Sequence, residues 1–234
     1  MANAPKACAG KPGGADRVAV RRRILIVDDH AIVREGLIQR INREEDLVVC
    51  AEAGDAQEGL AAVERHDPDL VVVDISLPGR GGLELIKDIV ATHPKIPVLG
   101  LSMHDEVVFG ERVLRAGGRG YVSKSEDAST MLVAIRRVLD GGIYLSEKVS
   151  SLMLGSLSGA GKGESSSPVD RLTDREIEVF SLIGRALGTT EIARSLNMSV
   201  KTVEAHRANI KSKLGLRTGP ELVRRAVLWA ETAR

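Results

Sequence analysis

Short apolar runs alternate five times with amphipathic stretches between residues 21 and 146, and this alternation restricts the possible folds most strongly. Each run is continuously apolar, which is typical of parallel strands buried on both faces. The stretches between the runs place their apolar residues at helical spacing. We therefore predict a doubly wound α/β domain with a five-stranded parallel sheet. The predicted strands are 24–27, 47–53, 70–75, 98–103 and 120–123, and the predicted helices are 31–41, 56–65, 83–92, 107–116 and 128–139.

The rest of the chain divides into three parts of different composition. Residues 1–20 mix Ala, Gly, Pro and Lys without periodicity, which predicts a flexible N-terminal tail. Nine Gly or Ser residues among the fourteen positions 155–168 indicate a flexible linker. Helical periodicity without a strand pattern continues to the C-terminus. We expect a tail at 1–20, the α/β domain at 21–146, a linker at 147–169 and a small all-α domain at 170–234.

The charge changes sign at the same boundary. Residues 21–146 carry 16 basic and 21 acidic side chains, whereas residues 170–234 carry 12 basic and 8 acidic ones. A basic helical domain suggests a polyanionic partner such as nucleic acid. Aromatic residues make up only 2% of the chain, which argues against base stacking as the main binding mode.

The chain has no feature of a membrane or disulfide-stabilised protein. No run approaches the roughly 20 apolar residues that span a bilayer. The two cysteines, Cys8 and Cys50, do not make a disulfide framework, which favours a reducing compartment. Cys50 lies in an apolar run and is expected to be buried. We therefore expect a cytoplasmic protein without a membrane partner.

Carboxylates follow two strands that should be neighbours in the sheet. Asp28 and Asp29 come directly after the first strand, and Asp74 lies at the end of the third. In a sheet of order 2-1-3-4-5 these strands are adjacent, and ligands bind outside their carboxyl ends. Three carboxylates packed together repel one another unless a cation joins them. Oxygen ligands of this kind suit Mg²⁺.

Two further side chains are expected at the same edge of the sheet. Ser102 ends the fourth strand and Lys124 ends the fifth. A carboxylate that attacks phosphorus, with Mg²⁺, a lysine and a hydroxyl to hold the phosphoryl oxygens, would use this whole set. Each residue alone has a plainer explanation, since a strand-terminal Asp often caps a helix or forms a turn. The combination at successive strand ends favours phosphoryl transfer.

Four segments resemble the receiver domain of two-component response regulators, which has a flavodoxin-like (CheY-like) fold. They are IVDDH at 26–30, VVDISLPGRGGLE at 72–84, LSMH at 101–104 and GYVSK at 120–124. The resemblance implies that Asp74 accepts a phosphoryl group from a sensor histidine kinase. It further implies an acidic Mg²⁺ site of Asp28, Asp29, Asp74 and the Ser76 carbonyl, a phosphate-binding Lys124, a switch hydroxyl on Ser102 and a switch aromatic at Tyr121.

The C-terminal domain contains the pattern of a helix-turn-helix. Thr173 is expected to cap a first helix, and Thr189 or Thr190 a second short one. Ser199 would cap a third helix that runs to about residue 214. The second and third helices are joined by a turn at 197–199, which is the spacing of a DNA-binding helix-turn-helix.

The third predicted helix has two different faces. Val203, Ile210 and Leu214 fall on one side, where they can pack against the domain. Small and charged residues occupy the opposite side, which allows close approach to a major groove. A plain amphipathic helix with a solvated charged face would give a similar pattern, but the basic charge of the domain favours DNA.

The exposed face suggests specific contacts with DNA. Ala205 and Ala208 would touch thymine methyl groups, and Glu204 would accept a hydrogen bond from N4 of cytosine. Basic side chains around them would reach phosphates. The full set of residues expected at the DNA is Thr190, Lys201, Thr202, Glu204, Ala205, His206, Arg207, Ala208, Lys211 and Lys213.

Residues 170–234 resemble the LuxR-type helix-turn-helix of NarL/FixJ-type response regulators, most clearly in EIARSLNMSVKTVEAHRANIKSKLG. Three positions depart from relatives. Asp174 stands where relatives often have Pro, Thr190 where they often have Lys, and Glu204 where some have a base-reading Lys. The site preference of those relatives therefore does not transfer to this chain.

The sequence predicts a phosphorylation-dependent transcriptional regulator that binds paired DNA half-sites as a homodimer. It would not be an enzyme beyond its own phosphorylation at Asp74 and the slow loss of that group. Two alternatives stay open. One is a phosphorylation-independent DNA-binding regulator whose receiver serves as a dimerisation or docking module. The other, a Mg²⁺-dependent phosphatase, is disfavoured because Ser76, two residues after Asp74, is a poor general acid.

Overall fold

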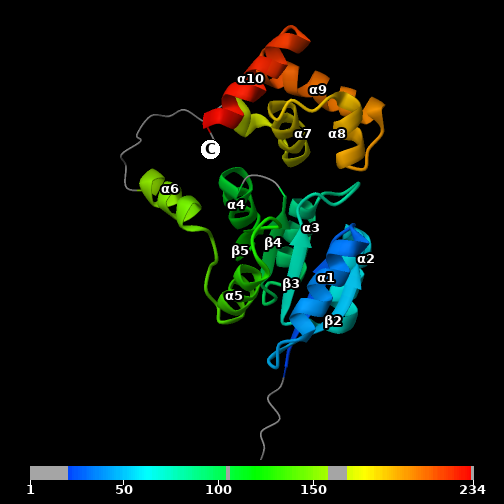
Figure 1. The fold of residues 1–234 in the computed structure, drawn as a ribbon, viewed down its shortest axis with the longest axis vertical. Coiled ribbons are helices and arrows are strands. Elements are labelled where there is room, and N and C mark those ends of the chain that lie inside the picture. The colour runs from blue at the N-terminus through cyan, green and yellow to red at the C-terminus, as the bar shows by residue number, and fades with distance from the viewer. Residues whose placement is uncertain (1–20, 104–105, 158–167, 233–234) are drawn as a thin grey trace, which may run out of the picture.

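The computed structural model describes residues 21–103, 106–157 and 168–232, and its N-terminal domain is the predicted five-stranded α/β fold (Figure 1). All strand pairs are parallel, and the strand order is β2-β1-β3-β4-β5. The strands are β1 (Arg22–Val27), β2 (Leu47–Ala53), β3 (Leu70–Asp74), β4 (Val98–Ser102) and β5 (Gly120–Ser123). The helices between and after them are α1 (Ala31–Asn42), α2 (Ala56–His66), α3 (Gly82–Thr92), α4 (Glu106–Arg115) and α5 (Ala128–Leu139).

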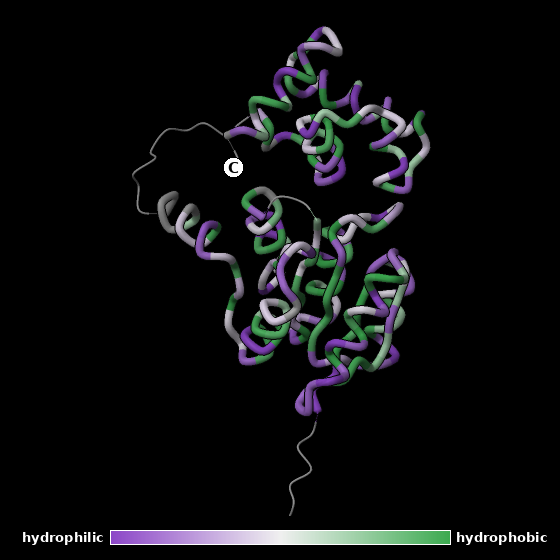
Figure 2. Tube along the Cα trace, viewed as in Figure 1, coloured by the Kyte–Doolittle hydropathy of each residue, from purple (hydrophilic) through white to green (hydrophobic). Residues whose placement is uncertain are grey.

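Helices cover both faces of the sheet. On β1, Ile24 and Ile26 pack with residues of α1 and α5, whereas Leu25 and Val27 pack with residues of α2, α3 and α4. Both sets are fully buried, which explains why the strands are continuously apolar. Figure 2 shows this as hydrophobic strands flanked by helices of mixed hydropathy. Among the described residues, no helix is both long and apolar enough to cross a membrane.

Parallel pairing brings the carboxyl ends of the central strands to one edge of the sheet. Asp28 follows β1, Asp74 ends β3, Ser102 ends β4 and Lys124 follows β5. The register pairs Asp74 with Leu101 and Ser102 with Ser123, so these strand ends lie at similar levels. The candidate residues of the N-terminal domain therefore come together as a consequence of topology.

Cys50 is less buried than its apolar run predicts. It is half-buried, and its thiol lies 3.5 Å from the carbonyl oxygen of Ile24. The prediction of a buried residue was wrong because β2 is an edge strand, which has a neighbour on one side only.

The expected linker begins with a helix. α6 (Glu147–Leu157) packs against α4, and the side chain of Val149 is buried there against Gly110. The absence of a side chain on Gly110 allows this approach, since a Cβ there would lie 3.2 Å from a Val149 methyl group. The expected tail at 1–20 and linker residues 158–167 lie outside the described residues.

The C-terminal domain is helical, as predicted. A short 3-10 turn at Pro168–Arg171 leads into four helices. They are α7 (Asp174–Gly184), α8 (Thr189–Ser195), α9 (Val200–Leu214) and α10 (Gly219–Thr232). The core of this domain is formed by apolar residues from all four helices, including Phe180 of α7, whose ring lies 5.3 Å from that of Trp229 on α10.

Side-chain caps define two of the three predicted helix starts. Thr173 accepts a hydrogen bond from the amide of Glu176 in a capping box, and Ser199 accepts one from the amide of Thr202. The prediction of a threonine cap for α8 was wrong. Gly188 is the N-cap there and Thr189 is already helical, because Glu191 reaches back to the Gly188 amide.

Gly82 is the glycine whose replacement should perturb the N-terminal domain most. A Cβ on Gly82 would lie 1.9 Å from the carbonyl oxygen of Asp74, so the backbone of α3 or β3 must move. We expect Gly82→Ala to lower the free energy of unfolding of this domain by about 1–3 kcal/mol. Hydrogen exchange of the β1 and β3 amides, followed by mass spectrometry, measures this domain separately from the other.

Gly36→Ala provides the matched control. Gly36 lies inside α1 with nothing within 4 Å of a Cβ, so alanine should stabilise this helix by about 1 kcal/mol or less. Equal protection of the β3 amides in Gly82→Ala and the wild type would contradict the packing argument.

Candidate functional site

Lys124 connects two buried carboxylates at the carboxyl edge of the sheet. Its Nζ lies 2.7 Å from Asp74 Oδ2 and 2.6 Å from Asp28 Oδ2. The side chains of Asp28 and Asp74 are 0% and 1% exposed, and that of Lys124 is 8% exposed. The three residues come from three different strand ends, and their charges are compensated inside the protein rather than by water.

The charges in this pocket change one another's protonation. Burial raises the pKa of Asp74; the Lys124 ammonium opposes that shift and the Asp28 carboxylate adds to it. Burial disfavours the Lys124 ammonium, but the two carboxylates beside it outweigh this and raise the pKa of Lys124 above its ordinary value. The lysine is therefore held as a cation where negative charge is concentrated.

The oxygens of this pocket have capacity for a further cation. Asp28 Oδ2 and Asp29 Oδ1 are buried and have no hydrogen-bond partner among the described residues beyond the nearby Lys124 Nζ and His30 Nδ1, respectively. Ligand atoms of Asp28, Asp29, His30 and Asp74 all lie within 4.8 Å of one another. Such clustered carboxylate oxygens fit the oxygen coordination that Mg²⁺ prefers.

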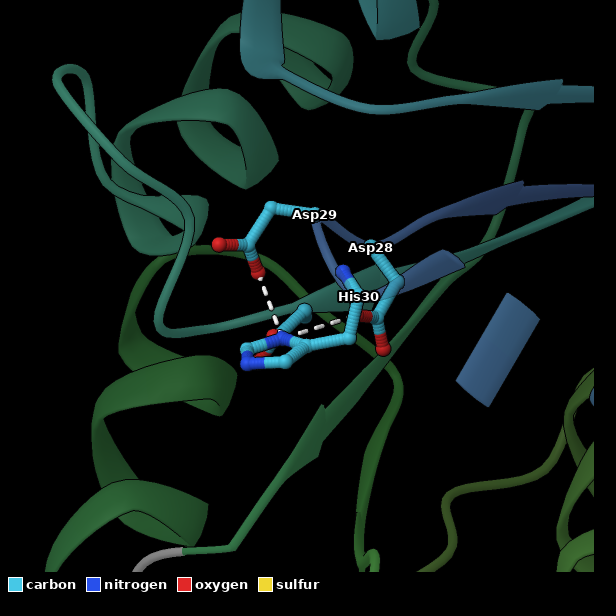
Figure 3. Close-up of side chains that lie close together, drawn as sticks. Asp28, Asp29 and His30 are labelled. Atoms are coloured by element: carbon cyan, nitrogen blue, oxygen red, sulfur yellow. Dashed lines mark hydrogen bonds and ion pairs between the residues drawn. The ribbon is translucent and has the colours of Figure 1, made fainter. Parts of the chain in front are cut away.

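His30 directs its imidazole ring toward the carboxylates of Asp28 and Asp29 (Figure 3). Its Nδ1 is 2.8 Å from Asp29 Oδ1, and its backbone amide donates to Asp28 Oδ1 at 2.9 Å. The turn after β1 thereby fixes the orientation of both aspartates. His30 belongs to the IVDDH motif, but nothing in the sequence predicts this contact.

The remaining predicted residues of the pocket surround Asp74. The Ser76 amide donates to Asp74 Oδ1 at 2.9 Å. Ser102 is buried, and its carbonyl oxygen accepts from the Lys124 amide at 2.7 Å. Tyr121 is also buried, at 2% exposure, within β5. The structure thus brings Asp28, Asp29, Asp74, Ser76, Ser102 and Lys124 to one edge of the sheet.

The C-terminal domain presents most of the predicted DNA-contacting residues at its surface. Val203 and Ile210 of α9 are buried in the domain core, and Leu214 packs partly against it, as the helical spacing of these residues predicts. The opposite face of the helix is accessible. The exposed predicted contacts are Thr190, Lys201, Thr202, Glu204, Ala205 and Ala208.

Four predicted contacts are less accessible. His206, Arg207, Lys211 and Lys213 are only partly exposed. Lys213 lies 2.6 Å from Glu176 of α7, and Arg207 lies 3.7 Å from Glu204. Although burial opposes the shift, hydrogen bonds from Lys213 and Thr173 lower the pKa of Glu176. Lys213 therefore supports the packing of α9 on α7 in this arrangement.

Charged side chains join the two domains. Asp174, in the first turn of α7, lies 2.5 Å from Arg112 of α4 and 3.3 Å from Lys87 of α3. Arg112 also donates to the carbonyl oxygen of Leu172 at 3.3 Å. Asp174 occupies the position where relatives often have Pro, which could not make these contacts. The roles of Lys87 and Arg112 could not be predicted from the sequence, because the hydrophobic pattern of one domain does not indicate where the other domain lies.

A cavity of about 420 Å³ lies between the domains. The loop after β3 lines it from one side, with residues such as Gly79 and Arg80. Thr202 and His206 of α9 line it from the other side. Figure 1 shows the corresponding arrangement, in which α7 and α8 lie above α3 and α4. Two predicted DNA contacts thus face the N-terminal domain.

Comparisons with known families match both domains. Residues 24–136 match the response regulator receiver domain, and residues 170–226 match the luxR family of bacterial regulatory proteins. The oxygen regulatory protein NreC of Staphylococcus aureus is 38% identical over 209 residues, which cover 88% of this chain and 96% of NreC.

Solved structures of similar proteins include the RcsB response regulator. RcsB of Salmonella typhimurium matches with a TM-score of 0.54 and 27% identity, covering 89% of this chain and 99% of RcsB. A structure of two RcsB dimers bound to two parallel DNAs matches with a TM-score of 0.54 and 27% identity, covering 87% of this chain and 97% of the RcsB chain.

Removal of the Lys124 ammonium should destabilise the N-terminal domain. Lys124→Ala leaves the buried Asp28 and Asp74 without their cation, and we expect a loss of about 3–5 kcal/mol in metal-free buffer. Burial on folding raises the pKa of Asp74, and the Lys124 ammonium that opposes this shift is absent from the variant, so the loss should be larger at pH 8 than at pH 5. Thermal unfolding with and without Mg²⁺ measures both effects.

Mg²⁺ should recover part of the stability of Lys124→Ala, because the metal replaces the missing positive charge. The exposed Lys95→Ala is the control and should change stability by less than about 0.5 kcal/mol. A Lys124→Ala protein as stable as the wild type in metal-free buffer at pH 8 would refute the role of this ion pair.

Proposed function

Since this chain belongs to the two-component response regulators that join a receiver domain to a LuxR-type DNA-binding domain, we propose that Asp74 is the residue through which phosphorylation controls it. The chain is a phosphorylation-regulated transcription factor with a histidine kinase partner. The observation that carries the assignment of Asp74 is its burial beside Lys124 and Asp28, at the edge where β3 ends.

The proposed phosphorylation uses the pocket as follows. A carboxylate oxygen of Asp74 attacks the phosphorus of a phosphohistidine; the phosphorus–nitrogen bond breaks and an acyl phosphate forms. Lys124 compensates the negative charge of the phosphoryl oxygens, and the Ser102 hydroxyl binds one of them. Asp28, Asp29, Asp74 and the Ser76 carbonyl would hold Mg²⁺. The metal supplies positive charge that offsets repulsion between the carboxylates and the incoming phosphoryl group.

The proposed output is a change in how the two domains meet. Ser102 precedes the segment that leads into α4, and Arg112 of α4 contacts Asp174 of the C-terminal domain. A shift of α4 on phosphorylation would loosen this contact and free Thr202 and His206 from the cavity between the domains. The RcsB dimers on DNA support binding as a homodimer, in which α9 of each copy is the recognition helix and the two half-sites lie about one helical turn apart.

The alternative of a phosphorylation-independent DNA-binding regulator makes a different prediction for variants of Asp74. If the receiver were only a dimerisation or docking module, DNA binding and promoter output would not change in Asp74→Asn or Asp74→Glu. The complete set of acidic residues and Lys124 favours a phosphorylated receiver instead. A phosphatase activity lacks support, because the side chain two residues after Asp74 is Ser76 rather than a carboxylic acid.

Phosphorylation of Asp74 can be measured directly by mass. We expect the wild type to gain one phosphoryl group when incubated with Mg²⁺ and a small-molecule phosphodonor, and to lose it at alkaline pH because acyl phosphates hydrolyse there. Asp74→Asn should gain nothing, since an amide is not a nucleophile for phosphorus. Intact-mass spectrometry followed by DNA binding of the same samples provides the readout.

Two outcomes of this experiment would contradict the assignment. One is an equal phosphoryl gain in Asp74→Asn, which would place the modification on another residue. The other is a phosphorylated wild type that binds DNA no differently from the unmodified protein, which would favour the docking-module alternative.

The interdomain ion pairs should hold unphosphorylated protein in a state of lower DNA affinity. Asp174→Asn removes the charge that binds the half-buried Arg112 and the exposed Lys87, two contacts worth about 1–2 kcal/mol together. We therefore expect about 5- to 30-fold tighter DNA binding without phosphorylation, and little change after phosphorylation. Fluorescence anisotropy with promoter DNA at fixed salt measures the two states.

Two matched variants separate this mechanism from a general charge effect. Arg112→Gln breaks the same contact from the other domain and should also raise affinity, although it removes a positive charge. Glu231→Gln removes a negative charge from the exposed surface of α10 and should have a much smaller effect. Equal affinities of Asp174→Asn and Glu231→Gln in the unphosphorylated state would rule out the proposed contact.

A further inference from the structure

Thr189 contacts the recognition helix on its exposed side. Its hydroxyl donates a hydrogen bond to Glu204 Oε1 at 2.9 Å, across 15 positions of sequence. Thr189 is the first residue of α8 and Glu204 lies in the second turn of α9. This side-chain contact joins the start of one helix of the helix-turn-helix to the second turn of the other.

The contact leaves the carboxylate accessible but oriented. The Glu204 side chain is 58% exposed, so it is not part of the domain core. Arg207 Nε lies 3.7 Å from Oε1, the same oxygen that Thr189 binds. Both contacts fall on Oε1, and Oε2 therefore retains its capacity to accept a hydrogen bond.

The surroundings of Glu204 match a surface that approaches bases closely. Lys201, Ala205 and Ala208 on the same helix are all exposed. The two alanines allow the helix backbone to enter a groove deeply, and Lys201 can compensate nearby phosphate charge. A carboxylate here is repelled by phosphates, so its presence on this face requires a partner that donates hydrogen bonds.

Base edges in the major groove offer few such donors. They are the N4 amine of cytosine and the N6 amine of adenine. Adenine presents its N7 acceptor beside N6, which repels a carboxylate, whereas cytosine presents no acceptor on that edge. An oriented carboxylate therefore discriminates in favour of cytosine.

We propose that Thr189 is a positioning residue that holds Glu204 for the recognition of a cytosine in each DNA half-site. This inference rests on the proposed DNA-binding function and adds a residue from outside the recognition helix. Thr189 restricts the rotamers of Glu204 before DNA binds, so that less side-chain freedom is lost on binding. It also keeps Oε1 engaged, which directs Oε2 to the base.

The test is selection from a random DNA library by phosphorylated full-length protein, followed by sequencing. The wild type should select a C·G pair at one position of each half-site. Glu204→Ala should lose about tenfold or more of that preference and keep the preferences at other positions. Thr189→Val, which replaces the hydroxyl with a methyl group, should lose about 3- to 10-fold at the same position.

Matched variants distinguish positioning from a structural role. Ser195→Ala removes an exposed hydroxyl elsewhere on α8 and should leave the preference at that position unchanged, and Thr189→Ser should retain it. Thr189→Val combined with Glu204→Ala should lose no more than Glu204→Ala alone. Thermal unfolding and sequence-independent DNA affinity at low salt verify that every variant is folded.

The outcomes separate this inference from the function on which it rests. A wild type that selects no sequence would overturn both. A wild type that selects a motif while Glu204→Ala keeps every base preference would overturn base reading by Glu204. Loss of the cytosine preference in Glu204→Ala, with Thr189→Val identical to the wild type, would overturn the positioning role of Thr189.

Discussion

The ion pairs of Lys124 with Asp28 and Asp74 are the interaction on which the functional part of this protein depends. Two carboxylates with 1% exposure or less would repel one another without a cation between them. Lys124 supplies that cation from the end of β5. The pocket therefore depends on the adjacent positions of β1, β3, β4 and β5 in the sheet. A sheet with another strand order would not place these three residues together. The fold and the proposed phosphorylation site are therefore parts of one electrostatic arrangement.

The same edge of the sheet also determines where the second domain lies. Helices α3 and α4 contact α7, and the loop after β3 lines the same cavity as Thr202 and His206 of α9. The surface near the proposed phosphorylation site therefore also faces the recognition helix. Asp174 is central to this contact, since it pairs with both Arg112 and Lys87. The proposed charge change at Asp74 thus needs to act over only a few packed elements to affect DNA binding. This short path favours direct coupling between the domains.

Most of the fold and most of the receiver pocket could be predicted from sequence. Continuous apolar runs predict buried parallel strands, and their order predicts that Asp28, Asp74 and Lys124 meet. The structure bears this out because strand ends in a parallel sheet cannot lie elsewhere. The predictions failed where the local pattern was ambiguous. Gly188 caps α8 although two threonines follow it, and Cys50 is half-buried because periodicity does not distinguish an edge strand from a central one.

What the sequence by itself determined is local: the strands, most helix limits, the caps at Thr173 and Ser199, and the residue types at each strand end. These depend on hydrophobic periodicity and on short-range hydrogen bonds, and both involve residues only a few positions apart in the sequence. Only the tertiary structure decided that Asp174 meets Arg112, that Lys213 pairs with Glu176, and that Thr189 binds Glu204. Those contacts join elements that no periodic pattern relates. Their partners are set by how helices and domains pack, because long charged side chains bind whichever partner the packing brings within reach.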